Sequence, residues 1–195
     1  MKTIVITHPV PQPDEAKVID EIMQMGVYRV HLRRPSWSED ETRKFLDQLS
    51  PEALSKIVLH DCHDIINEYP LAGLHYNSRH LFSLIDPHNN PGTQSVSCHS
   101  LEEVDAYKSH VDYLFLSPIF DSISKDNYHG TFTHQELLDA GRDIDQKVFA
   151  LGGISLRTLP HIYDIPFGGI ALLGAFWQSV ARHTYLRDIQ QFLDL

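Results

Sequence analysis

Short apolar runs alternate with longer amphipathic stretches along the whole chain. The short runs are rich in β-branched and aromatic residues, and several are apolar on both faces, which is typical of buried parallel strands. Eight runs of this kind occur, at residues 3–7, 27–32, 56–60, 71–76, 95–98, 112–117, 147–152 and 168–174. Helical patterns lie between and after them, at residues 14–25, 38–49, 62–68, 78–84, 101–109, 134–142, 155–163 and 175–193.

The order of these elements predicts an α/β fold. Strands that alternate with helices pair in parallel through right-handed crossovers. Eight strand–helix units in 195 residues leave about 24 residues for each unit, which fits a small (β/α)8 TIM barrel. A doubly wound open sheet of five or six strands is the alternative, but it requires two of the eight runs to be loops. No linker or internal repeat is found, so residues 1–195 are expected to form a single barrel domain.

Three of the helices are expected to begin with capping boxes. Ser38, Ser100 and Thr133 each precede a glutamate by three residues, so the paired side chains can bind each other's backbone N–H groups. The stretch 175–193 is expected to form one helix over the outside of the barrel. Its apolar stripe contains Phe176, Trp177, Val180, Leu186, Ile189 and Phe192.

Charge and cysteine content narrow the classes of function. The 16 Lys and Arg residues against 26 Asp and Glu residues give a formal net charge of −10, so neither nucleic acid nor an anionic membrane is an expected partner. Cys62 and Cys98 are too few for a disulfide scaffold and are expected to be buried free thiols. No signal peptide or membrane-spanning run is seen, so a cytoplasmic enzyme or binding protein is expected.

The chain has 13 histidines, and five of them stand at the ends of the first five expected strands. These five are His8, His31, His60, His75 and His99. The carboxyl ends of the strands carry the active site of a (β/α)8 barrel, so one rim is expected to hold all five. Because side chains alternate along a strand, Ser97 and His99 share a face that Cys98 does not. Cys98 and His99 are therefore not expected to form a nucleophilic pair, while His31 and Arg33 share a face.

Glycines at the ends of the last two strands indicate a phosphate site. Gly152 and Gly153 follow the seventh strand and Gly174 ends the eighth, where free backbone N–H groups can receive an anion. The loop after the sixth strand offers a cation and two hydroxyl groups from Ser122, Ser124 and Lys125. The run His-Asp-Cys-His-Asp at 60–64 has metal-ligating residue types but no spacing typical of zinc, so zinc is not favoured there.

Four ordered segments resemble the thiamin phosphate synthase/TenI family of small (β/α)8 barrels. They are SVSCHSLEEVDAY (95–107), DYLFLSPIF (112–120), FALGGIS (149–155) and GGIALLGAF (168–176). They occur in the order of the family and at about its spacing, so the resemblance covers nearly the whole chain. It implies a role in thiamine biosynthesis, in which thiamine-phosphate pyrophosphorylases join a pyrimidine pyrophosphate to a thiazole phosphate with the help of Mg²⁺.

The resemblance is weakest in the pyrophosphate half of the site. The synthases have a Gln-x-Arg-x-Lys pattern in which this chain keeps Arg33 but replaces the glutamine by His31 and the lysine by Pro35. Their Asn-Asp pair corresponds to His60 and Asp61, so the resemblance leaves Asp61 as a weak candidate Mg²⁺ ligand. A second metal-ligating aspartate of the family is replaced by His80, which is expected to weaken Mg²⁺ binding.

The thiazole-phosphate half of the family site is better retained. The resemblance assigns substrate or phosphate binding to Arg33, His60, Ser97, Ser122, Ser124, Lys125, Gly152, Gly153, Leu173 and Gly174. Gly174 stands where a serine is usual, so a hydroxyl is lost while the backbone donor remains. This combination resembles the TenI branch, which includes thiazole tautomerases. A proton shift suits a histidine, so His99 is expected to be the acid and base, with His31 as a second proton carrier or a contact to the substrate carboxylate.

Three functions stay open at this point, with the tautomerase favoured. A tautomerase needs no cofactor and takes a phosphorylated thiazole as its partner. A synthase needs Mg²⁺ and a pyrimidine pyrophosphate as well, and it would use Arg33, Arg34 or His80 in place of the missing groups. A regulatory protein would bind thiazole or thiamin phosphate without turnover. The sequence leaves open whether the chain forms a homo-oligomer.

Overall fold

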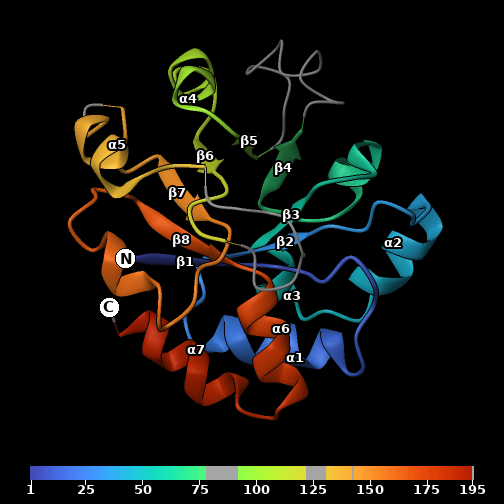
Figure 1. The fold of residues 1–195 in the computed structure, drawn as a ribbon. Helices are drawn as coiled ribbons and strands as arrows, with labels where there is room; N and C mark the ends of the chain where they lie inside the picture. The colour runs from blue at the N-terminus through green and yellow to red at the C-terminus, as the bar shows by residue number, and fades with distance from the viewer. Residues whose placement is uncertain (78–91, 122–130, 142, 195) are drawn as a thin grey trace.

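The computed structural model describes residues 1–77, 92–121, 131–141 and 143–194, and its eight parallel strands close into a barrel (Figure 1). The strands are β1 (Lys2–Ile6), β2 (Arg29–Leu32), β3 (Ile57–Leu59), β4 (Gly73–Tyr76), β5 (Thr93–Cys98), β6 (Tyr113–Leu116), β7 (Val148–Leu151) and β8 (Gly169–Leu172). Each strand pairs with the next, and β8 pairs with β1. All eight expected strands are confirmed, and the alternative of an open sheet is wrong.

Helices surround the barrel (Figure 1). They are α1 (Glu15–Gln24), α2 (Glu39–Leu46), α3 (Pro51–Leu54), η1 (His63–Glu68), α4 (Leu101–Tyr107), α5 (His134–Asp139), η3 (Leu159–Ile162), α6 (Gly174–Ala181) and α7 (Tyr185–Leu193). The expected helix at 78–84 lies outside the described residues. No helix in the described part of the chain has the length and apolar character needed to cross a membrane.

Two of the three expected capping boxes are confirmed. Ser38 and Thr133 each exchange hydrogen bonds with the glutamate three residues later. Ser100 caps α4 by accepting from the backbone N–H of Glu103, but the Glu103 carboxylate accepts from His99 instead of Ser100. The carboxylate therefore ties the residue after β5 to the helix that follows it.

The prediction of one helix at 175–193 is wrong. His183 has a φ of 56°, a left-handed conformation that ends α6, and α7 begins two residues later. This turn leaves Leu186 43% exposed, while Ile189 and Phe192 stay in the core. The expected helix at 155–163 is likewise reduced to the short η3, because the Thr158 hydroxyl bonds the Gly153 carbonyl and the Ser155 N–H, which competes with helix formation.

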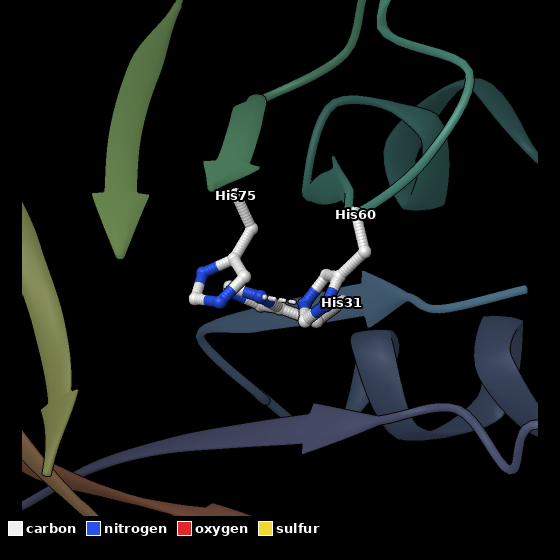
Figure 2. A group of neighbouring side chains, drawn as sticks. All are labelled: His31, His60 and His75. Atoms are coloured by element: carbon white, nitrogen blue, oxygen red, sulfur yellow. Dashed lines mark hydrogen bonds between the residues drawn. The ribbon is translucent and has the colours of Figure 1, made fainter. Parts of the chain in front are cut away.

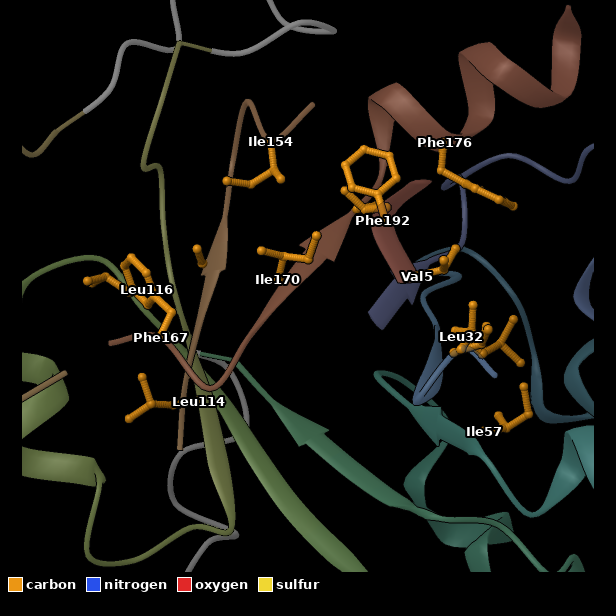
Figure 3. Packing of buried hydrophobic residues seen from close by; sticks show 14 of the residues in the cluster. Val5, Leu32, Ile57, Leu114, Leu116, Ile154, Phe167, Ile170, Phe176 and Phe192 are labelled. Atoms are coloured by element: carbon orange, nitrogen blue, oxygen red, sulfur yellow. The ribbon is translucent and has the colours of Figure 1, made fainter. Parts of the chain in front are cut away.

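Side chains of the strands alternate between two apolar layers. Those inside the barrel form the smaller cluster of Ile4, Ile6, Tyr113, Phe115, Phe149 and Ala171. Those outside pack against the helices in a larger cluster, part of which Figure 3 shows. Cys98 is fully buried in the outer cluster, as predicted. Cys62 is also a free thiol but only half-buried, because it follows β3 and precedes η1 rather than lying within a strand.

Candidate active site at the carboxyl end of the barrel

Three histidines from neighbouring strands meet inside the carboxyl end of the barrel (Figure 2). His31 belongs to β2, His60 follows β3 directly, and His75 belongs to β4. The register pairs Leu59 with Leu74, so the next position brings His60 beside His75. The rings of these two histidines stack with their centroids 4.0 Å apart. We call His31, His60 and His75 the histidine cluster.

His31 is the most enclosed member of the histidine cluster. It has no exposed surface, and its ring lies 4.8 Å from the ring of Phe115, measured between centroids. Its Nδ1 lies 2.8 Å from Nε2 of His60, and its Nε2 lies 2.7 Å from the hydroxyl of Tyr113. His31 can therefore exchange protons with the barrel mouth only through a neighbour, which limits its predicted role as a contact to the substrate.

His75 joins the histidine cluster to two serines of β5. Its Nδ1 lies 2.9 Å from the hydroxyl oxygen of Ser95, and its Nε2 lies 2.8 Å from that of Ser97. Ser95 also donates to the Leu74 carbonyl at 3.3 Å. Ser97 therefore points into the barrel, while Cys98 lies in the outer cluster, so the predicted opposition of these two side chains is confirmed.

Burial disfavours the charged forms of His31 and His60. Removal from water lowers the pKa of His31 well below its ordinary value, and the nearby charges of His75 and Arg29 lower it further. Burial likewise lowers the pKa of His60, with added contributions from His75, His31 and Arg33. Burial raises the pKa of Tyr113, so its hydroxyl keeps its proton. His31 and His60 therefore favour the neutral imidazole, whose unprotonated nitrogen can act as a ligand or acceptor.

His99 lies apart from these contacts, exposed on the rim after β5. Its Nδ1 is 3.0 Å from the backbone oxygen of Ser117 and 3.3 Å from the Ser117 hydroxyl. A carbonyl oxygen can only accept, so Nδ1 carries the proton of the neutral ring. The unprotonated nitrogen is then Nε2, which is the state a general base requires. The fifth histidine of the predicted rim, His8, is engaged by the Val10 N–H at 3.2 Å.

The predicted phosphate end has glycines that the fold requires. Gly152 and Gly153 follow β7 with φ values of 92° and 66°, which favour glycine. A Cβ on Gly153 would lie 2.4 Å from the Asp121 carbonyl oxygen, so the loop after β6 packs directly on this turn. Leu173 precedes α6 without a side-chain cap, and Gly174 is its first residue. The remaining predicted residues of this end, Ser122, Ser124 and Lys125, lie outside the described residues.

Adjacent arginines after β2 lie in different environments. Arg33 is half-buried, and its charge acts on His60. Arg34 is 2% exposed and forms an ion pair with the equally buried Glu15 of α1. It also donates to the Thr7 hydroxyl at 2.6 Å. The alternative in which Arg34 binds pyrophosphate is therefore wrong, because its guanidinium is already used inside the protein.

The resemblance gives the Mg²⁺ ion of a synthase one candidate ligand among the described residues, Asp61. Asp61 is half-buried and supplies one carboxylate directly after His60 in the sequence. Mg²⁺ prefers six oxygen ligands, of which proteins usually supply one or two carboxylates while substrate phosphates and water supply the rest. His80, at the other expected metal position, lies outside the described residues and has no carboxylate. Asp61 as a magnesium ligand stays a prediction.

Sequence reasoning placed five histidines on one rim but did not identify which of them meet. Strand parity could have selected His31 and His75, since both point inward, but the approach of His60 depends on the register of β3 against β4. Tyr113 and Ser95 were missed altogether. Their signal was the same parity, because each lies on an inward-facing position of β6 or β5.

Known proteins resemble the chain over nearly its full length. The family profile described as thiamine monophosphate synthase matches residues 3–176. A thiamine phosphate pyrophosphorylase from Bacteroides thetaiotaomicron is 33% identical, with a TM-score of 0.84, over 100% of this chain and 98% of that chain. One from Pyrococcus furiosus is 19% identical, with a TM-score of 0.73 over 98% of this chain and 91% of that chain, a likeness of fold alone. No curated protein sequence matches the chain.

Proposed function

Because the chain belongs to the thiamine monophosphate synthase family, we propose that it binds a thiazole phosphate in thiamine biosynthesis and moves a proton on it, as a thiazole tautomerase does. The observation that carries this proposal is the setting of His99. Its ring is exposed at the carboxyl end of the barrel, and the Ser117 carbonyl fixes the proton on Nδ1. Nε2 can then take a proton from carbon and return it at another position of the ring.

The turn after β7 and the start of α6 hold the phosphate in this proposal. Backbone N–H groups of Gly153 and Gly174 lie at the ends of neighbouring strands, where barrels of this kind bind phosphate. The proton shift needs no cofactor, since base and acid are the same imidazole. We assign the contact to a carboxylate of the substrate to Arg33, because it is a half-buried cation whose charge acts on His60.

A thiamin phosphate synthase is the second candidate, and the names of the matched structures favour it over a tautomerase. The protein that is 33% identical over the full length is called a thiamine phosphate pyrophosphorylase. Arg33 and Asp61 are also retained from the synthase pattern. The buried ion pair of Arg34 weighs against this reaction, because that guanidinium is already used inside the protein.

Two assays on one preparation separate these functions. The first follows proton exchange on the thiazole carboxylate phosphate tautomer by NMR, and the second follows thiamin phosphate formation from both substrates with Mg²⁺. We expect the first reaction to be accelerated and His99→Asn to slow it by at least about 100-fold, the usual contribution of a general acid or base. His110→Asn is the matched control, since His110 is exposed and lies on the turn after α4.

Each other outcome has a definite meaning. Full activity of His99→Asn, or no acceleration by the unaltered protein, contradicts the tautomerase. Formation of thiamin phosphate establishes the synthase. Binding of thiazole phosphate without turnover in either assay assigns the chain a binding role.

A further inference from the structure

We propose that the histidine cluster of His31, His60 and His75 binds one divalent transition-metal ion, with Zn²⁺ as the expected ion. Each histidine offers one ring nitrogen, and these nitrogens lie within 4.8 Å of one another. The proposal does not depend on the reaction assigned to His99, because it concerns different side chains.

The spacing of the ring nitrogens suits a common ion. At a metal–nitrogen distance of about 2.0–2.1 Å, two ligands are about 2.9 Å apart for a right angle at the metal and about 3.3 Å apart for a tetrahedral angle. Nδ1 of His31 and Nε2 of His60 are 2.8 Å apart, so this pair already has nearly the required separation. The His75 nitrogen approaches by a rotation of its side chain, since the three ring centroids are only 4.0–5.3 Å apart.

The ligand chemistry selects the class of ion. Three imidazoles bind Zn²⁺, Cu²⁺, Ni²⁺ and Fe²⁺ well, whereas Mg²⁺ and Ca²⁺ prefer oxygen. The exposed fractions of His31, His60 and His75 are 0%, 6% and 0%, so the site is shielded from competing water. Three protein ligands leave a coordination position for water or a substrate atom, as in catalytic zinc sites. His60 is the ligand with exposed surface, so ions reach the site past its ring.

Hydrogen-bond partners that orient the ligands are present as well. A metal-bound histidine usually donates its other ring N–H to a neighbouring group. Nε2 of His31 lies 2.7 Å from the Tyr113 hydroxyl, and the nitrogens of His75 reach Ser95 and Ser97. One nitrogen of His75 exchanges its serine for the ion, and the other keeps its serine.

Binding of the ion replaces the hydrogen bond between His31 and His60, and neither histidine loses a proton. In the metal-free protein, a single proton lies between Nδ1 of His31 and Nε2 of His60. In the tautomer of His31 that carries its proton on Nε2, toward the Tyr113 hydroxyl 2.7 Å away, Nδ1 has a free electron pair. His60 moves its proton from Nε2 to Nδ1, and both facing nitrogens then bind the metal.

Metal titration of the untagged, chelator-treated protein tests the proposal. We expect one Zn²⁺ per chain by calorimetry and elemental analysis, and Co²⁺ bound in its place with visible d–d absorption. His60→Gln and His75→Gln each weaken binding by at least about tenfold, and Tyr113→Phe by about 10–100-fold. His110→Asn leaves binding unchanged, because His110 is exposed on the turn after α4 and does not belong to the histidine cluster.

A readout on the unaltered chain guards against variants that do not fold. Addition of Zn²⁺ must shift the imidazole ¹⁵N signals of three buried histidines together, and circular dichroism checks the fold of each variant. No binding, more than one equal site, or equal affinity in a folded His60→Gln variant overturns the proposal. The cluster is then a hydrogen-bond network between β2, β3 and β4 only.

Discussion

Removing one partner of the buried ion pair between Arg34 and Glu15 is expected to destabilise the protein strongly. The two side chains are only 2% and 3% exposed. Arg34 also donates to Thr7, and its guanidinium carbon lies 4.8 Å from the centre of the Trp37 ring. Glu15→Gln keeps the shape of the side chain but leaves the arginine charge buried without a counter-charge. Such a change costs about 3–5 kcal/mol.

The structure also predicts that a second substitution recovers most of this loss. In the intact pair, Oε1 of Glu15 and Nε of Arg34 have no hydrogen-bond partner within the described residues, so the pair gains less than an ideal one. Glu15→Leu combined with Arg34→Met removes both buried charges together with their unsatisfied atoms, and buried pairs replaced by apolar side chains of similar size often leave stability unchanged. The double variant is therefore expected to be more stable than Glu15→Gln alone.

Urea unfolding followed by circular dichroism measures both effects. A loss of about 3–5 kcal/mol corresponds to a decrease in Tm of about 6–20 °C for a chain of this length. Glu68→Gln is the matched control, because it breaks the ion pair with Arg43 at 30% and 46% exposure, where such pairs contribute about 0.2–1 kcal/mol. The reasoning is refuted if Glu15→Gln costs no more than Glu68→Gln, or if the double variant is less stable than the single one.

Two further predictions concern the turn after β7 and the thiols. Gly153→Ala is expected to cost more stability than Gly26→Ala in urea unfolding. Both glycines have positive φ, but only at Gly153 would the added Cβ meet the Asp121 carbonyl oxygen, at 2.4 Å. Equal costs of the two substitutions contradict a close approach at this turn. Burial raises the pKa of Cys98 to about 12, so about one part in ten thousand of this thiol is thiolate at pH 8. Iodoacetamide is therefore expected to label the half-buried Cys62 first. Equal labelling of both cysteines in the folded protein, measured by mass spectrometry, contradicts this prediction.

The barrel could be predicted from the sequence because each strand carries its own signal. Runs such as KVFALG are apolar on both faces, which only a sheet covered on both sides can satisfy. The C-terminal helices could not be divided in the same way. The turn between α6 and α7 depends on the left-handed backbone conformation of His183. The hydrophobic pattern of the sequence does not reveal that a histidine adopts this conformation.

The sequence could predict which side chains of the candidate site share a face of a strand, but not which of them touch. Alternation along β5 correctly predicted that Ser97 and Cys98 lie on opposite faces. Which histidines touch depends on strand stagger, and a shift of one residue in the pairing of Leu59 with Leu74 would separate His60 from His75. Short strands of three and four residues contain too little pattern to fix that register in advance.

Arg33 and Arg34 are adjacent in the sequence, but their side chains face different parts of the protein. Both are long cations directly after β2, and the sequence offered either as a substitute for the missing pyrophosphate contact. The odd position shares the inward face of His31, so the charge of Arg33 acts on His60. The even position faces α1, where Glu15 neutralises Arg34. A cation for an anionic substrate is therefore available from Arg33 alone of these two, and any tight pyrophosphate site needs a further cation from elsewhere in the chain.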